Sequence, residues 1–179
     1  IYIHVLATAV IYAQVAGKTP LTNGMKPEDF HYLSLSGQVE CPGHNDAEEF
    51  GNTSSALLSC GLSQADLDQM WACLAGMMYL GNVKFGEGDI ATIASTGATD
   101  PVRVAEALLG VGDMVERLTK RAITVNGEVS MADHTPANAA QARDALVKIM
   151  YARLFEWLVT RINRTVDDPA KSKHYICLL

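Results

Sequence analysis

The sequence predicts a mainly α-helical protein with a short β-hairpin and an edge-cut terminal strand. Long stretches place apolar residues at helical spacing, Asn126-Gly127 separates two strand-like runs, and residues 174–179 form an apolar run typical of a buried strand. With 49% hydrophobic and 19% charged residues, the chain of 179 residues has the composition of a globular protein with a sizeable core.

The first third of the chain predicts two helices separated by loops. An apolar run over residues 1–16 is helical in pattern, and a loop rich in Gly, Pro and Asn follows it. Tyr32–Leu35 is expected to be short and extended. Asp46 is expected to cap a helix that runs from Ala47 to about Cys60.

The clearest local signature begins at Ser63, which forms a capping-box pattern with Asp66. Apolar residues at helical spacing follow it: Leu67, Met70, Trp71, Leu74, Met77 and Met78. Gly81 is expected to close this helix, and residues 83–85 are expected to be extended.

Two short helices and a hairpin are expected next. Asp100-Pro101 starts the first helix, which runs to Leu109, and the second ends near Thr119. Strand-like runs over 121–125 and 128–130 then flank Asn126-Gly127, the strongest signal for a two-residue hairpin turn.

The longest element is a helix over residues 136–163, with Thr135 as its N-cap and Pro136 at the first position. At 1.5 Å per residue this helix is about 42 Å long, close to the diameter of a compact chain of this size. Its early turns carry an apolar face and an opposing polar face. The apolar face holds Ala142, Leu146, Ile149 and Met150, and the polar face holds Arg143, Asp144 and Lys148.

The later turns of this helix are apolar most of the way round, which predicts burial inside a body larger than this chain. The charges of Arg153, Glu156 and Arg161 exclude a membrane span. The chain also begins at Ile1 inside an apolar run and stops at Leu179 inside another, so both ends are expected to be cuts in a longer fold.

Charge and cysteine usage limit the class of protein. A net charge of −6 argues against a general nucleic-acid or anionic-membrane binder. The four cysteines are widely spaced and form no C-x-x-C pair, which is typical of a reducing compartment. A cytoplasmic protein is therefore expected.

Two weak motifs do not support a chemical site. Gly17-Lys18-Thr19 matches the end of a phosphate-binding loop, but Tyr12 stands where the pattern requires its first glycine. Cys41 and His44 supply at most half of a metal site, and no Ser or Cys lies in a nucleophile motif.

The hairpin is the best candidate for a functional surface. Arg117, Lys120 and Arg121 precede it, and Glu128 follows the turn. From residue chemistry alone, a solvated loop is favoured over a contact with an acidic partner, and both interpretations remain open.

The order of several short motifs resembles the myosin motor domain. The early ones are KPEDFHYL at 26–33, DAEEF at 46–50 and LGNVxF at 80–85. The later ones are ALLGV at 107–111, RAIT at 121–124, DALVK at 144–148 and YARLFEWLVxRIN at 151–163. The resemblance extends from about Pro27 to Leu179.

This resemblance implies that residues 1–179 are a fragment of the P-loop NTPase-type myosin motor fold, from the later part of the upper actin-binding subdomain. Residues 119–135 are similar to the actin-contact loop often called the cardiomyopathy loop, in which Lys120 and Arg121 would attract the acidic actin surface. Counting back sixteen residues from the Asp144 motif gives Glu128, the position at which myosins tend to carry a hydroxyl or acidic residue.

The same resemblance implies a cytoplasmic, cytoskeleton-associated motor whose partners are the actin filament and the rest of the motor domain, with no nucleic acid and no membrane span. Residues 136–163 would be a central helix, and residues 174–179 a strand of the central sheet. No catalytic, cofactor-binding or metal-binding residue is expected in this fragment. Mg-ATP would bind elsewhere in the parent ATPase, so the fragment alone is not expected to be an enzyme. The alternative is a stand-alone helical interaction module derived from a myosin segment.

Overall fold

The computed structural model describes residues 25–35, 37, 43, 45–93, 100–125 and 127–166. Within these ranges the protein is mainly helical and contains one two-stranded antiparallel sheet. The elements are η1 (Pro27–Asp29), α2 (His31–Ser34), α3 (Asp46–Ser59), α4 (Gln64–Gly81), α5 (Pro101–Leu109), α6 (Met114–Thr119), β1 (Lys120–Val125), β2 (Glu128–Asp133) and α7 (Pro136–Val166). The predicted helix over 1–16 and the predicted strand over 174–179 lie outside the described residues.

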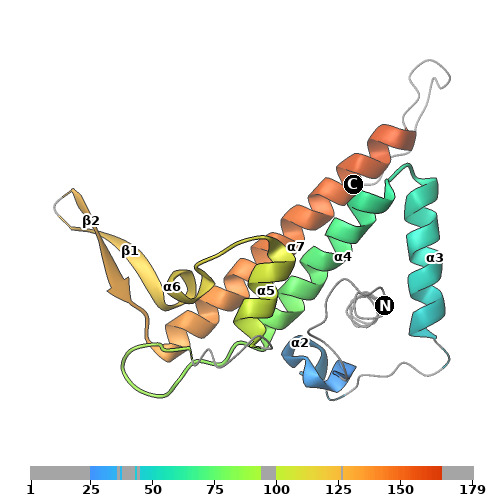
Figure 1. The fold of residues 1–179 in the computed structure, drawn as a ribbon. Coiled ribbons are helices and arrows are strands. Elements are labelled where there is room, and N and C mark those ends of the chain that lie inside the picture. The colour runs from blue at the N-terminus through green and yellow to red at the C-terminus, as the bar shows by residue number, and fades with distance from the viewer. Residues whose placement is uncertain are drawn as a thin grey trace.

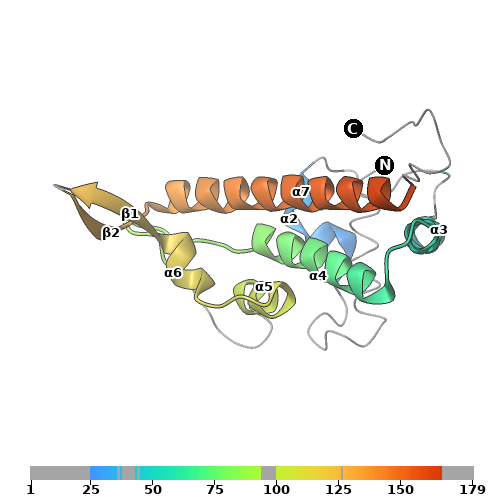
Figure 2. The ribbon, with the colours of Figure 1, turned by 90° about the horizontal axis from the view of Figure 1, so that it is seen from above.

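Helices α4 and α7 form the frame of the molecule. They run side by side in opposite directions, and α5 packs against α4 (Figures 1 and 2). The β1–β2 hairpin connects α6 to α7 and projects beyond the first turn of α7 (Figure 2). The hairpin therefore extends from one end of the long helix.

Local capping explains where the main helices begin. The Ser63 side chain accepts a hydrogen bond from the Asp66 N–H at 3.1 Å, and the Asp66 carboxylate accepts one from the Ser63 N–H at 3.0 Å. The Ser63 N–H and the Ser63 hydroxyl both donate to the Asp66 carboxylate, and these two hydrogen bonds hold the pKa of Asp66 below its ordinary value. Asp100 caps α5, and Thr135 caps α7 by accepting from the Asn138 N–H at 3.3 Å. The sequence predicted all three N-caps.

Two local predictions were wrong, and a third segment that was expected to be extended forms no strand. The segment that was expected to be extended at Tyr32–Leu35 forms helix α2 instead, because Phe30 and Leu33 turn to the same side and are both buried. The N-cap of α3 is Asn45, whose side chain accepts from the Ala47 N–H at 3.2 Å, rather than Asp46. Residues 83–86, part of which was also expected to be extended, have no regular secondary structure.

The core consists of two clusters along the α4–α7 frame. The first lies between α4, α5, α6 and the η1–α2 segment, with the rings of Phe30 and Tyr79 in edge-to-face contact at 5.4 Å between centroids. The second lies between α3, α4 and the later turns of α7, where Phe50 and Trp71 approach to 4.7 Å. Both clusters use the apolar stripe of α4 that follows Ser63.

The predicted faces of α7 need a correction. Arg143, which was assigned to the polar face, is buried, whereas Ile149, which was assigned to the apolar face, is exposed. Ala139 of α7 is fully buried, and the partly buried side chains of α7 that pack against the two clusters are Leu146, Val147, Met150, Leu154, Leu158 and Ile162. Phe155 and Trp157 remain exposed in this chain. Within the described ranges, no helix is both long and apolar enough to cross a membrane.

Candidate functional site

The hairpin is a regular antiparallel pair, with Lys120 opposite Asp133 at its root and Val125 opposite Glu128 at its tip. Its root is fixed to the body by backbone hydrogen bonds. The His134 N–H donates to the Thr119 carbonyl at 2.7 Å, and the His134 carbonyl accepts from the Ala91 N–H at 2.7 Å. The hairpin direction is therefore set by the end of α6 and by the loop that contains Ala91.

The alternation of side chains along a strand separates two of the predicted site residues. Lys120 lies on one face of the hairpin, whereas Arg121 lies on the other, together with Glu128. Arg121 is opposite Ala132 at the root, so Arg121 and Glu128 are separated by four residues along the strands, about 14 Å. The structure therefore does not bring the three charges together.

Lys120 already has a partner. Its Nζ lies 3.2 Å from Oε1 of Glu116 on the preceding turn of α6, and both side chains are partly exposed. An exposed pair of this kind contributes little to stability, but it compensates the charge of Lys120. The net positive potential at the root is smaller than the sequence indicates.

Arg121 and Glu128 are exposed, and neither forms an ion pair with any residue in the described part of the chain. Arg117, one turn before the hairpin, is also exposed and has no ion pair within the same ranges. Asp133 brings one exposed carboxylate to the same root, so the two arginines leave a small excess of positive charge there, and Glu128 places negative charge near the tip. An acidic partner surface would be attracted to the root.

Sequence reasoning missed the apolar side of the hairpin. Val129 and Met131 alternate along β2 and lie 73% and 53% exposed on the face that also carries Ala122 and Lys120. The period-2 spacing of Val129 and Met131 was the available signal. A two-stranded hairpin with an exposed apolar face offers a partner apolar contact area as well as charge.

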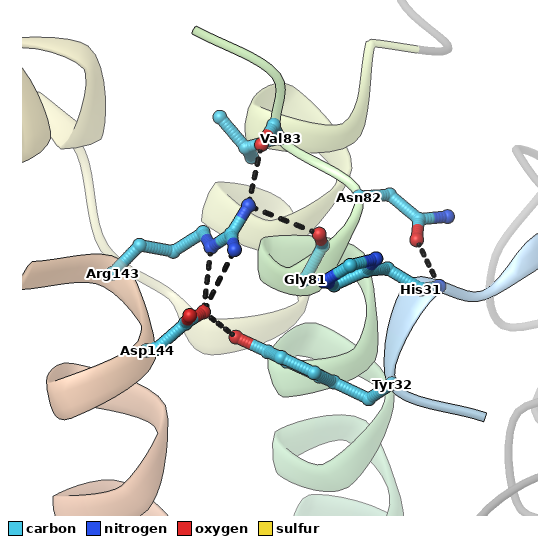
Figure 3. A network of polar contacts seen from close by, with 7 residues as sticks. All are labelled: His31, Tyr32, Gly81, Asn82, Val83, Arg143 and Asp144. Atoms are coloured by element: carbon cyan, nitrogen blue, oxygen red, sulfur yellow. Dashed lines mark hydrogen bonds and ion pairs between the residues drawn. The ribbon is translucent and has the colours of Figure 1, made fainter. Parts of the chain in front are cut away.

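A buried polar network anchors the helix that follows the hairpin (Figure 3). The Nη1 group of Arg143 on α7 donates to the carbonyls of Gly81 at 3.2 Å and Val83 at 2.7 Å. The Nε and Nη2 groups of Arg143 contact Oδ1 of Asp144 at 2.9 and 2.8 Å. The Tyr32 hydroxyl donates to the same oxygen at 2.6 Å. One guanidinium therefore joins α7 to the carbonyls at the end of α4.

The electrostatics of this network follow from burial and hydrogen bonding. Burial, together with the hydrogen bond to Asp144, raises the pKa of Tyr32 well above its ordinary value. Desolvation opposes ionisation of Asp144, but the hydrogen bonds from Tyr32 and Arg143 outweigh it and hold the pKa of Asp144 below its ordinary value. The network is therefore a neutral tyrosine, a carboxylate and a guanidinium at neutral pH.

The other candidate motifs gain no support. Gly17-Lys18-Thr19, Cys41 and His44 lie outside the described residues. In the described ranges, no group of three or more His, Cys, Asp or Glu side chains is placed to hold a metal ion.

Comparison with known proteins identifies the family. The model of the myosin head (motor domain) family matches residues 4–179. The chain is 32% identical over 161 residues to Myosin-6 of Arabidopsis thaliana, covering 86% of this chain and 11% of that protein. It is 35% identical over 162 residues to Myosin-1 of Sclerotinia sclerotiorum, covering 86% of this chain and 13% of that protein. The chain thus spans about a tenth of the length of these relatives.

Proposed function

Because the chain belongs to the myosin motor-domain family, we propose that it is a segment of an actin-based, ATP-driven motor and forms part of the wall of the actin-binding cleft. The β1–β2 hairpin is the actin-contact loop in this proposal. Arg121 attracts the acidic surface of actin, Lys120 contributes less because Glu116 compensates it, and Glu128 supplies a fixed negative charge near the tip.

The observation that supports this proposal is that Arg121 and Glu128, which form no ion pair within the described ranges, lie on a hairpin that projects from a fixed root. The hairpin extends beyond the first turn of α7 (Figures 1 and 2), and its root is tied to α6 through the His134–Thr119 hydrogen bond. A charged group on such a platform meets a partner without first ordering a loop, so less conformational entropy is lost on binding.

ATP chemistry is assigned to other parts of the parent protein. In this proposal Mg-ATP binds to a P-loop NTPase-type core, residues 136–163 form a central helix of the motor, and residues 174–179 join its central sheet. The protein works in the cytoplasm on the cytoskeleton. The family match over residues 4–179 favours a motor segment over the alternative of a stand-alone helical interaction module.

The test uses charge reversal at Glu128 in the complete motor. In this proposal the Glu128 carboxylate contacts a basic group of actin, so Glu128→Lys is expected to lower actin-activated ATP turnover by roughly two- to five-fold, the range expected for an exposed ion contact, and to leave basal turnover nearly unchanged. The loss should shrink as salt rises from low to physiological concentration. Steady-state ATPase assays over a series of actin concentrations measure both quantities.

Glu49→Lys is the matched control, because Glu49 lies on exposed α3, at the opposite side of the molecule from the hairpin (Figure 1). It makes the same change in net charge. Equal losses of basal and actin-activated turnover in Glu128→Lys, or equal effects of the two substitutions, would contradict the assignment of the hairpin.

A further inference from the structure

Met131 differs from the other methionines of this protein in its exposure to solvent. All seven methionines lie in the described ranges, so their burial can be compared directly. Met25 and Met150 are partly buried and pack against the core clusters. Met131 on β2 is 53% exposed, whereas four others are at most 5% exposed, namely Met70, Met77, Met78 and Met114. A reagent that reaches methionine sulfur from solvent therefore meets Met131 first.

The hairpin keeps this thioether open to solvent. Met131 is opposite Ala122, whose methyl group is too small to cover a methionine side chain. Val129, the next residue on the same face of β2, is also exposed. The hairpin itself projects beyond the first turn of α7 (Figure 2). Met131 therefore lies on the apolar face that the hairpin presents to a partner.

Peroxides also oxidise thiols, but the described cysteines are less accessible than Met131. Cys60 and Cys73 are both partly buried. Burial raises the pKa of the Cys73 thiol, which lowers the fraction of the reactive thiolate. Within the described ranges, Met131 is therefore the most accessible sulfur that a peroxide can oxidise.

We propose that Met131 is a site of reversible oxidation by peroxides and that its sulfoxide weakens the contact of the hairpin with its partner. In this reaction a lone pair of the thioether sulfur forms a bond to one peroxide oxygen while the O–O bond breaks. The second oxygen takes up the proton of the first and leaves as water. The sulfur is oxidised and the peroxide is reduced. Methionine sulfoxide reductases reverse the modification.

Oxidation changes the apolar face of the hairpin into a partly polar one, because a sulfoxide carries an oxygen that accepts hydrogen bonds. A partner that covers Val129 and Met131 would have to bury this oxygen, which costs free energy unless the partner supplies a donor. The identity of this partner as actin rests on the proposed function. The preferential oxidation of Met131 depends only on its exposure.

The first measurement tests the site. The whole protein that carries this chain is treated with hydrogen peroxide and digested, and mass spectrometry follows the gain of one oxygen atom at each methionine. We expect Met131 to react at least roughly ten-fold faster than Met70 in the folded protein, and at a similar rate in the protein unfolded by urea. Similar rates for Met131 and Met70 in the folded protein would overturn the proposal.

The second measurement tests the consequence by co-sedimentation of the complete motor with actin. Mild treatment with peroxide should weaken actin binding roughly three- to ten-fold, and a methionine sulfoxide reductase should restore it. Met131→Leu is the matched control, because leucine keeps an apolar side chain of similar volume without the sulfur. Its affinity should not change on the same treatment. Equal losses in wild type and Met131→Leu would overturn the role of Met131.

The charge variant of the hairpin separates this inference from the proposed function. If Glu128→Lys lowers actin-activated turnover but oxidation of Met131 leaves actin affinity unchanged, the hairpin contacts actin and the effect of the sulfoxide is overturned. If neither change affects the interaction with actin, the proposed function fails, and the effect of the sulfoxide on actin fails with it.

Discussion

Arg121 on β1 and Arg143 on α7 are separated in the chain only by the rest of the hairpin and the first turns of α7, yet their surroundings differ in burial and in pairing. Arg143 is buried, and its guanidinium is held by two carbonyls and a carboxylate. Arg121 is exposed at the root of the hairpin and forms no ion pair within the described ranges.

This difference separates structural charges from charges that are available to a partner. Removing a buried, paired charge leaves its partners unsatisfied in a low-dielectric interior, which costs several kcal/mol. Removing an exposed charge costs the fold almost nothing and affects only what binds to it. The anchor at Arg143 and the free charge at Arg121 should therefore respond in opposite ways to substitution.

The largest effect is expected at the anchor. Arg143→Met should lower the free energy of unfolding by about 3 kcal/mol, because the Gly81 and Val83 carbonyls and the Asp144 carboxylate lose their donor. Urea denaturation measures the change as a lower midpoint with an unchanged slope.

Arg153→Met is the matched control on the same helix. Arg153 pairs with Glu156 at 2.9 Å, but the two side chains are 77% and 66% exposed. The control should change the free energy of unfolding by less than about 0.5 kcal/mol. Similar losses in the two variants would mean that burial does not distinguish the anchor.

A smaller, pH-dependent effect is expected from Tyr32→Phe. Loss of the hydroxyl removes one hydrogen bond to Asp144 and should cost about 1 kcal/mol at pH 7. Because the folded-state pKa of Asp144 is depressed, the stabilisation is present above the unfolded pKa of about 4 and is lost as pH falls through the folded value.

The difference between wild type and Tyr32→Phe should therefore shrink as the pH is lowered from 7 to 3. Urea denaturation of both proteins across this range provides the measurement. A difference that stays constant with pH would show that the hydroxyl acts through packing rather than through the Asp144 carboxylate.

The smallest effects on stability are expected at the hairpin. Arg121→Gln and Lys120→Gln should each change the free energy of unfolding by less than about 0.5 kcal/mol. Their effects on actin affinity in the complete motor should differ. Arg121→Gln is expected to weaken co-sedimentation with actin at low salt roughly two- to five-fold, and Lys120→Gln less, because Glu116 already compensates Lys120.

Equal losses of actin affinity in the two variants would show that the Glu116–Lys120 pair opens on binding. Lys120 and Arg121 would then contribute equally to the attraction of actin. A loss of stability in Arg121→Gln would show that the Arg121 side chain, like that of Arg143, stabilises the fold.

Sequence reasoning performed best where one or two neighbouring residues decide the outcome. The caps at Ser63, Asp100 and Thr135 lie within four residues of the N–H groups that they satisfy, and all three helices begin there. The two strands that flank the predicted Asn126-Gly127 turn likewise pair with each other, with Val125 opposite Glu128. The motif order identified the myosin family, which the family match confirms.

It failed where the deciding contact was distant. Tyr32–Leu35 is helical because Phe30 and Leu33 are buried in the core and because Asn82, fifty-one residues away along the chain, accepts the His31 N–H at 2.8 Å. Arg143 was assigned to the polar face because arginine is rarely buried unless it is paired, and the two carbonyls that accept its hydrogen bonds belong to residues about sixty positions earlier.

The sequence by itself determined the family, the helices that begin at strong caps and the position of the hairpin, because these depend on hydrogen bonds and dihedral preferences within a few residues. Only the tertiary structure decided which side of α7 is buried and that Arg143 anchors it to the end of α4. Those outcomes depend on which distant groups compete for the same volume and the same donors, and a linear pattern of residues does not contain that information.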